Sequence, residues 1–475
     1  MGEEKRETVL CIDLDGSLLK TDLLYESFAA LLRTNPLEVI RFPSWLLGGK
    51  ARLKAELAKR MSFDPGRLPY NERVLEYLHR EKARGRRLVL ATASDRRFAT
   101  LVAEHLGVFD EVVASDGSRN LKGKLKSDLL VDRFGEKGFD YVGDSIADRV
   151  IWERAAQCIL VSRDKGALKR MGNKVVIAEE LFSPRAPAVF FRALRVHQWV
   201  KNLLVFVPLV MAHQLGDADR VLKALLAFLA FSLCASAVYL MNDLADLDAD
   251  RLHPTKRHRP IASGDLGIPF AIGLAPVLLL MSGALALFTS AGFGVLLGLY
   301  FALTSAYSFA LKKIAILDIV VLASLYTLRV LAGGRAVDVP VSPWLLGFSM
   351  FLFFSLACMK RYSELLSLRK KNEELAAGRG YRASDLDQVA SFGAASGYMA
   401  VLVMALYVNS GEVTRLYTKP QALWVICPLL LFWISRTWLI AHRGEMHEDP
   451  IVFAIRDRTS YLVGFLCAAI LWVAM

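Results

Sequence analysis

Residues 8–17 read TVLCIDLDGS, an apolar run that ends abruptly at two aspartates. The first five residues have the length and apolar character of a buried strand, and the polar turn after them ends it. Two later segments repeat this pattern: RLVLA at 87–91 runs into TASD, and FDYV at 139–142 runs into GDSIAD. Helical stretches separate the three strands. The sequence therefore predicts an α/β doubly wound domain with a parallel sheet.

Polar side chains follow each of these three strands. Ligands of parallel sheets bind at the carboxyl ends of the strands, so we expect Asp13, Asp15, Asp144 and Asp148 to meet there beside the hydroxyl of Thr92. So many carboxylates repel one another unless a hard cation such as Mg²⁺ lies between them. A carboxylate in such a site can attack phosphorus. The alternative, a surface turn and a helix cap, is disfavoured because three such clusters each follow a strand.

This set of motifs resembles the haloacid-dehalogenase (HAD) phosphatase superfamily over nearly all of residues 8–180. The resemblance implies that Asp13 is the nucleophile that forms a phospho-aspartate, with Asp15 as the general acid and base. It also implies that Thr92 holds the phosphoryl oxygens and that Asp144 and Asp148 are metal ligands, alongside the first two aspartates. We therefore expect a competent phosphatase site.

The family's lysine, which neutralises the nucleophile and the phosphate, has two candidates here. Lys126 is the better match, but the basic run LKGKLK at 121–126 leaves Lys124 as an alternative. Between the first two strands, four short helical stretches predict a small helical cap: 22–32, 37–47, 51–61 and 71–84.

The charge density falls sharply in the second part of the chain. Residues 1–180 contain 32 Lys and Arg and 28 Asp and Glu, whereas residues 181–475 contain 27 and 19. Repeated apolar runs of membrane-span length accompany the fall. We therefore expect a phosphatase domain at 1–182 and an all-α transmembrane bundle at 183–475. Nine helices are predicted: 198–213, 221–243, 267–288, 292–311, 315–334, 342–360, 393–410, 421–441 and 458–475.

Basic residues indicate how this bundle is oriented. The loops and edges around 244–266, 312–314, 361–392 and 442–457 hold 17 Lys and Arg, and the opposite connections hold about four. By the positive-inside rule, we expect the N-terminal domain to be cytosolic and the C-terminus to lie outside. We expect the membrane to be a bacterial inner membrane. The net charge of +12 suits a lipid surface or phosphorylated substrates, and no nucleic-acid motif is present. The six cysteines form no CxxC pair, which predicts buried thiols.

A second acidic segment, NDLADLDAD at 242–250, ends the second predicted span. On a helix with about 100° per residue, Asn242, Asp243, Asp246 and Asp250 share roughly a quarter turn. Such a face predicts a Mg²⁺ site, and the basic loop 251–260 after it suits a diphosphate. The alternative is an ordinary positive-inside loop with incidental acids.

This segment, the RPxxxG continuation at 259–264 and the predicted helices resemble the UbiA-type intramembrane prenyltransferase superfamily. The stretches RVHQWVKN at 195–202, HPTKRHRPIASG at 253–264 and KRYSEL at 360–365 narrow the resemblance to decaprenyl-phosphate phosphoribosyltransferases. Ordinary members of the superfamily carry a second aspartate-rich motif after span six. This chain has Lys360, Arg361 and Glu364 there, which favours a substrate with an additional phosphate, such as phosphoribosyl pyrophosphate.

The resemblance implies transfer of phosphoribose to a polyprenyl phosphate. The acidic segment would hold Mg²⁺ and the pyrophosphate, and the cations would take part of its charge or hold a second phosphate. Arg329 has two equal alternatives, facing the bundle interior or snorkelling to the outer surface. The residues with implied substrate roles are Lys201, Asn202, Asn242, Asp243, Asp246, Asp250, Lys256, Arg257, Arg259, Lys360 and Arg361.

Three functions remain open from the sequence. In the first, the membrane domain makes a lipid-linked phosphoribose and the phosphatase removes its 5-phosphate. In the second, the same fold uses a prenyl diphosphate donor with an aromatic or lipid acceptor. In the third, the bundle only anchors or scaffolds a phosphatase. These motifs do not specify the length of the lipid. They are compatible with a monomer and with a homo-oligomer.

Overall fold

The computed structural model describes residues 8–61, 64–116, 118–163, 177–182, 188–372, 374, 379–446 and 449–475. They form two compact units. The first comprises Met1–Leu194 together with Tyr239–Ala275, and the second comprises Arg195–Val238 together with Pro276–Met475. The predicted boundary after residue 182 adjoins residues 183–187, which lie outside the described residues. In space, the acidic segment and its basic loop belong to the phosphatase-like unit.

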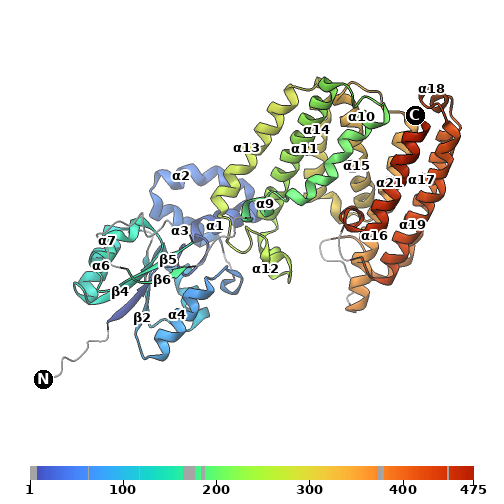
Figure 1. The fold of residues 1–475 in the computed structure, drawn as a ribbon. Helices are drawn as coiled ribbons and strands as arrows, with labels where there is room; N and C mark the ends of the chain where they lie inside the picture. The colour runs from blue at the N-terminus through green and yellow to red at the C-terminus, as the bar shows by residue number, and fades with distance from the viewer. Residues whose placement is uncertain are drawn as a thin grey trace. The chain divides into compact units, whose positions relative to one another are not determined.

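The first unit contains a six-stranded parallel sheet in the order β3-β2-β1-β4-β5-β6 (Figure 1). In the register, Ile12 lies opposite Leu90 on one side and Val142 on the other. The polar residues after β1, β2 and β4 therefore reach the same edge, as predicted. The doubly wound fold is confirmed. The strands are β1 (Val9–Ile12), β2 (Leu88–Asp95), β3 (Glu111–Ser115), β4 (Phe139–Gly143), β5 (Cys158–Ser162) and β6 (Ile177–Phe182).

Helices connect these strands, and the first three of those between β1 and β2 form a cap. The segment predicted as one helix at 37–47 is a 3-10 turn, Pro36–Arg41, followed by α2, because Pro43 can start a helix but cannot continue one. The cap packs against the core of the sheet through buried side chains that include Leu31, Trp45 and Leu57. The cap helices are α1 (Leu23–Thr34), α2 (Phe42–Leu47) and α3 (Lys50–Arg60). Helix α4 (Glu72–Ala83), which was predicted as part of the cap, instead packs beside β6, where Arg80 pairs with Glu179. The later helices of this domain are α5 (Arg96–Leu106), α6 (Lys124–Phe134) and α7 (Arg149–Trp152).

Long apolar helices dominate the rest of the chain. Seven are long enough to span a membrane, and α20 (Pro450–Arg456) with α21 (Arg458–Ala474), bent by 82°, makes up to eight. Helix α16 continues to Lys370, ten residues beyond the predicted end, so Lys360, Arg361 and Glu364 lie within it. The long helices are α11 (Ala218–Ala245), α13 (Ile268–Leu287), α14 (Ala291–Phe309), α15 (Leu317–Ala336), α16 (Pro343–Lys370), α17 (Leu386–Val408) and α19 (Ile426–Arg443).

The predicted first span differs most from its prediction. Residues Val196–Phe206 form a 3-10 helix, and Val207–Met211 form the short helix α10, so this apolar segment is shorter than the other spans. Two polar residues inside it, Lys201 and Asn202, are buried, and Pro208 begins α10. The described residues thus give seven or eight candidate spans of full length instead of nine.

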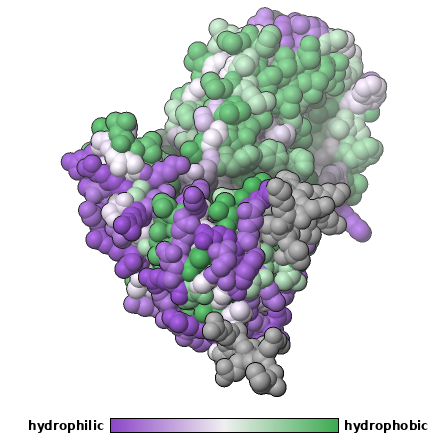
Figure 2. Space-filling view, turned by 90° about the vertical axis from the view of Figure 1, so that its left-hand side faces the viewer, coloured by the Kyte–Doolittle hydropathy of each residue, from purple (hydrophilic) through white to green (hydrophobic). Residues whose placement is uncertain are grey.

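The surface of the helices matches a lipid environment. On the face that Figure 2 shows, hydrophobic residues cover the helical bundle and hydrophilic residues cover the phosphatase domain. Large apolar side chains such as Leu280, Val295, Phe465 and Trp472 are more than two thirds exposed. Apolar side chains in such numbers are stable against hydrocarbon rather than water. The bundle is therefore an integral membrane domain.

One glycine permits the closest backbone approach inside the second unit. A Cβ atom added to Gly333 of α15 would lie 2.1 Å from the carbonyl oxygen of Val205. In contrast, a Cβ atom added to Gly298 of α14 meets nothing within 4 Å. The two positions differ in packing but both lie inside long helices.

We predict that Gly333→Ala destabilises the bundle, because the helix would have to move away from the 3-10 segment. Overpacking of this kind costs about 1–3 kcal/mol. Gly298→Ala is the matched control and leaves stability equal or higher, since alanine favours a helix. Thermal unfolding in detergent measures both, and equal midpoints for the two variants would contradict the close approach.

Candidate active sites

The end of β1 places Asp13 at the centre of the first site. This carboxylate is buried, and its Oδ1 accepts a hydrogen bond of 2.8 Å from Nζ of Lys126. The same ammonium donates to the hydroxyl of Tyr141 at 2.7 Å. Lys124 is exposed. The first turn of α6 therefore directs Lys126, and not Lys124, into the site.

Three of the four predicted metal ligands form one cluster. Carboxylate oxygens of Asp13, Asp144 and Asp148 all lie within 4.8 Å of one another. Burial, together with the charges of Asp13 and Asp148, raises the pKa of Asp144 to about 8. Burial also raises the pKa of Asp13 to about 7, against the opposing charge of Lys126. Such mutual repulsion fits a divalent cation, and an all-oxygen donor set suits Mg²⁺.

Asp15 lies outside this cluster, unlike its predicted place among the metal ligands. Its carboxylate accepts hydrogen bonds from the backbone N–H of Leu23 at 2.9 Å and from Oγ of Ser94 at 2.5 Å. Burial and the charge of Asp22 raise its pKa to about 6, which suits a group that both donates and accepts protons. Thr92 is fully buried, and its Oγ1 accepts a hydrogen bond from the N–H of Ser94.

Gly16 allows the loop after Asp13 to close over the cluster. Its φ angle is +82°, and a Cβ atom there would lie 2.3 Å from a carboxylate oxygen of Asp144. Any L-residue at this position would be strained and would push Asp144 out of the cluster. The backbone geometry therefore requires a glycine at this position of the DxDGS motif.

The second acidic segment is not one continuous helix. Helix α11 ends at Ala245, Asp246 lies at the break, and α12 spans Leu247–Leu252. Asp243 and Asp250 are both buried and converge on one nitrogen, Nη1 of Arg259, at 3.1 and 2.6 Å. Within the described ranges, the three carboxylates do not form a single cluster like that of the first site. Because Asp243 and Asp250 already accommodate a cationic group, a divalent ion could use the same oxygens.

The remaining residues of this segment have different surroundings. Asn242 is half-buried, and Lys256 and Arg257 are exposed on the loop after α12. Asp248 is not on the predicted face of Asn242, Asp243, Asp246 and Asp250. It forms an ion pair with Arg33 of the cap at 2.7 Å.

A buried ion pair attaches the same segment to the cap. Arg251 of α12 donates two hydrogen bonds to the carboxylate of Glu26 in α1, at 2.6 and 3.1 Å. A third polar contact runs from Nη1 of Arg163 to the carbonyl oxygen of Gly264 at 2.8 Å. Sequence motifs gave no sign of these contacts, because their partners are more than one hundred residues apart.

In the second unit, Arg361 differs from its predicted role as a phosphate clamp. Its side chain is fully buried and forms an ion pair of 2.6 Å with the equally buried Asp318. It also contacts Glu364, and Tyr381 donates a hydrogen bond to Asp318. The guanidinium of Arg361 is therefore engaged by carboxylates and links α15 to α16.

Lys201 and Lys360 meet at a residue that the sequence analysis missed. Their Nζ atoms lie 2.8 and 3.0 Å from the same carboxylate oxygen of Asp449. Nothing marks Asp449 in the sequence except its place before a proline. Tyr141 in the first site was also missed, because a tyrosine inside a strand is usually a core residue.

Asn202 and Arg329 also come together. Oδ1 of Asn202 accepts a hydrogen bond of 2.9 Å from Nε of Arg329, and its Nδ2 donates to Oγ of Ser232. Arg329 is only 6% exposed. Of its two alternatives, the structure supports the interior position and not the outer surface.

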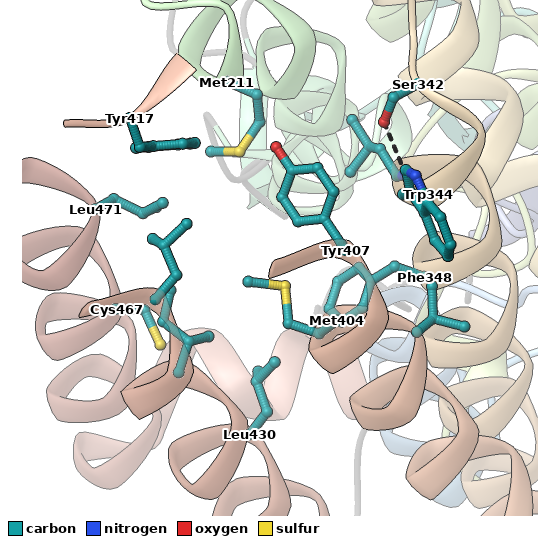
Figure 3. A pocket seen from close by; sticks show the side chains of 14 residues that line it. Met211, Ser342, Trp344, Phe348, Met404, Tyr407, Tyr417, Leu430, Cys467 and Leu471 are labelled. Carbon is teal, nitrogen blue, oxygen red and sulfur yellow. Dashed lines mark hydrogen bonds between the residues drawn. The ribbon is translucent and has the colours of Figure 1, made fainter. Parts of the chain in front are cut away.

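An apolar cavity of about 240 Å³ lies at the other end of α16 (Figure 3). Met404, Tyr407, Leu430 and Leu471 point into the same space. No charged residue lines it, so its chemistry suits a hydrocarbon chain.

A model of the UbiA prenyltransferase family matches residues 203–472, more than half of the chain. This protein belongs to the UbiA prenyltransferase family. Residues 10–151 match the haloacid dehalogenase-like hydrolase model, which agrees with the sheet and the carboxylate cluster. The protein is thus a UbiA-family membrane transferase with an N-terminal HAD-like domain.

Two relatives and one solved structure illustrate the similarity. The uncharacterized protein y4nM of Sinorhizobium fredii is 40% identical over 99% of this UbiA-family chain and 92% of its own. Decaprenyl-phosphate phosphoribosyltransferase of Mycolicibacterium smegmatis is 32% identical over 56% of this chain and 86% of its own. A UbiA homolog from Archaeoglobus fulgidus bound to GPP and Mg²⁺ is 17% identical, with a TM-score of 0.45 over 60% of this chain and 100% of its own.

Lys126→Met is expected to reduce hydrolysis of a generic phosphomonoester by at least about a hundredfold. The variant lacks the cation that neutralises both Asp13 and the bound phosphate. Lys124→Met removes the same charge two residues away, on the exposed side of the same helix, and should retain activity within about twofold. Phosphate release from p-nitrophenyl phosphate measures both. Similar losses in the two variants would contradict the assignment of Lys126.

Arg361→Lys is expected to destabilise the membrane domain, because lysine lacks the planar fork that serves both Asp318 and Glu364. Breaking a buried ion pair costs on the order of 3 kcal/mol. Arg369→Lys, an exposed position in the same helix, serves as the control. Thermal unfolding in detergent separates the two variants. A stable Arg361→Lys protein that had lost only transferase activity would instead support a phosphate clamp.

Proposed function

We propose that this protein transfers 5-phosphoribose from phosphoribosyl pyrophosphate to a polyprenyl phosphate and then removes the 5-phosphate. The carboxylate cluster beside Lys126 carries the proposal, because a phosphomonoesterase site lies on the same chain as a UbiA-family domain. The similarity to decaprenyl-phosphate phosphoribosyltransferase supports a product that is itself a phosphomonoester. One domain would then supply the substrate of the other.

For the transferase step, the acidic segment binds the donor, which arrives as a Mg²⁺–pyrophosphate complex. Asp243, Asp246 and Asp250, with Asn242, would hold Mg²⁺, and Arg259, which contacts Asp243 and Asp250, would take charge from the leaving pyrophosphate. The bond from ribose C1 to pyrophosphate breaks as a phosphate oxygen of the lipid attacks C1. Lys256 and Arg257 add positive charge from the loop. Neutralising the departing diphosphate is the main contribution of these residues.

For the phosphatase step, Asp13 attacks the phosphorus of the 5-phosphate and displaces the sugar oxygen. Asp15 donates a proton to that oxygen and then takes one from the water that hydrolyses the phospho-aspartate. Lys126 and the Thr92 hydroxyl hold the phosphoryl oxygens. Mg²⁺, held by Asp13, Asp144 and Asp148, would supply positive charge for the phosphate.

The proposal includes a topology for the protein in the membrane. We expect the phosphatase domain and the acidic segment in the cytosol of a bacterium, where phosphoribosyl pyrophosphate is available, and the C-terminus outside. A 3-10 helix rises about 2.0 Å per residue, so the segment Val196–Met211 can reach about 30 Å and complete a ninth span. The apolar cavity near Tyr407 suits the lipid tail.

The proposal predicts that membranes with this protein attach labelled phosphoribose to a polyprenyl phosphate and then release inorganic phosphate. In Asp13→Asn, release should stop and lipid-linked 5-phosphoribose should accumulate, because only the second step needs the nucleophile. Asp132→Asn, an exposed acid of the same domain, is the control. Thin-layer chromatography of the extracted lipids measures both steps.

Three outcomes would contradict parts of this scheme. No lipid-bound label, together with transfer from a prenyl diphosphate, would favour the alternative UbiA chemistry. Loss of the transfer step in Asp13→Asn would show that the two sites are coupled. Unchanged transfer in Asp243→Asn would remove the acidic segment from the reaction.

A further inference from the structure

Buried cations gather in the second unit around one carboxylate. Asp449 lies between Lys201 of the 3-10 segment and Lys360 of α16, and both ammonium groups contact its Oδ2 atom. The side chains of Lys201 and Asp449 are only 10% and 12% exposed. One carboxylate therefore pairs with two ammonium groups, of which that of Lys201 is nearly buried and that of Lys360 is partly exposed.

Arg329 adds a third cation to this cluster. Its guanidinium lies 5.4 Å from the centre of the Tyr326 ring, and Nζ of Lys201 lies 5.8 Å from the same ring. The hydrogen-bond acceptors of Arg329 are neutral: Oδ1 of Asn202, the hydroxyl of Tyr300 and the carbonyl of Leu325. In the part of the chain that the structure describes, no carboxylate forms an ion pair with Arg329.

The cluster of Lys201, Arg329, Lys360 and Asp449 thus has three positive charges and one negative charge. Excess charge buried away from water is expensive unless a ligand compensates it. A phosphomonoester carries a charge of about −1.5 to −2 at pH 7, which matches the excess of two. Helices and the tyrosine ring hold the cations in place, so the compensation would require little rearrangement.

A route into the cluster is present. The side chain of Lys360 is 35% exposed and, with Asp449, Ser363 and Ser367, lines a polar cavity of about 570 Å³. Glu364 and Lys370 line the same cavity with one charge of each sign, so they leave the excess of positive charge around Asp449 unchanged. A phosphate entering there would meet Lys360 first and would compete with Asp449 for both ammonium groups. Hydroxyl groups of the two serines can donate to its remaining oxygens.

We propose that Lys201, Lys360 and Arg329 form a binding site for a phosphomonoester, and that Asp449 occupies the lysines until the ligand displaces it. The proposal rests on the proposed function for its ligand, which is the lipid phosphate or the 5-phosphate of the ribosyl donor. The arginine of this site is Arg329 and not the predicted Arg361, because the guanidinium of Arg361 is bound by Asp318.

The test is equilibrium binding to the full-length protein in detergent, with Asp13→Asn as the background so that ligands are not hydrolysed. Farnesyl phosphate represents the lipid source and ribose 5-phosphate the donor source, and farnesol and ribose are the controls without phosphate. Lys201→Met and Lys360→Met should each weaken binding of one or both phosphates by tenfold or more. The exposed Arg335 of α15 gives a control, Arg335→Gln, which should change binding by less than twofold.

Asp449→Asn distinguishes a binding site from a structural cluster. Asparagine can still cap α20, where Asp449 now accepts a hydrogen bond from the N–H of Ile451, but it no longer competes with phosphate for the lysines. Binding should therefore become several times tighter. Weakening in Asp449→Asn, or equal binding in wild type and both lysine variants, would overturn the proposal.

The two ligands identify the source of the phosphate. A change confined to farnesyl phosphate assigns the site to the lipid, and a change confined to ribose 5-phosphate assigns it to the donor. Because binding is measured without turnover, a protein that binds phosphate here but transfers no phosphoribose would refute the proposed function and leave this site intact. Failure of both phosphates to bind the background protein would refute the site.

Discussion

A carboxylate that is removed from water needs positive charge beside it, and this constraint organises both units of the protein. Asp13 meets Lys126, Asp318 meets Arg361, Glu26 meets Arg251, and Asp243 and Asp250 share Arg259. Each pair joins different segments of the chain. The same rule explains why the first site, with three clustered acids and one lysine, is suited to a divalent cation.

The two candidate sites use this constraint in opposite ways. In the phosphatase-like site, negative charge exceeds positive charge, so a metal and then a phosphate complete it. Around Asp449, positive charge exceeds negative charge, which suits an anion without a metal. The proposed function, which involves a diphosphate and two phosphomonoesters, would use both kinds of site. The distribution of charge is thus consistent with successive phosphate chemistry on one chain.

Local patterns in the sequence predicted the part of the structure that local forces determine. Strand lengths and the polar residues after them located Asp13, Thr92 and Asp144, because parallel strands in register end at one edge. Apolar runs located the long helices for the same kind of reason. The orientation of Lys126 could not be decided from a run of alternating lysines, because it depends on where α6 begins.

Contacts between residues far apart in the chain could not be predicted from the sequence. Asp318 and Arg361 are 43 positions apart, so the sequence showed two polar residues near the membrane but not that they neutralise each other. The break at Asp246 likewise follows from tertiary packing, since the segment has no glycine or proline that would interrupt a helix. Asp449 had no motif at all. For the pair Asp318–Arg361 and for Asp449, a pairing partner and not a local propensity determines the geometry.

The contact between Glu26 and Arg251 has a consequence for how such a two-domain protein can evolve. Since Tyr239–Ala275 packs with the phosphatase-like residues, the N-terminal domain is not an independent module that recombination could exchange at a linker. A different hydrolase fused at the same point would leave Arg251 buried without its carboxylate and the carbonyl of Gly264 without Arg163. A replacement of the N-terminal domain would therefore need matching changes at Arg251 and at the loop that holds Gly264.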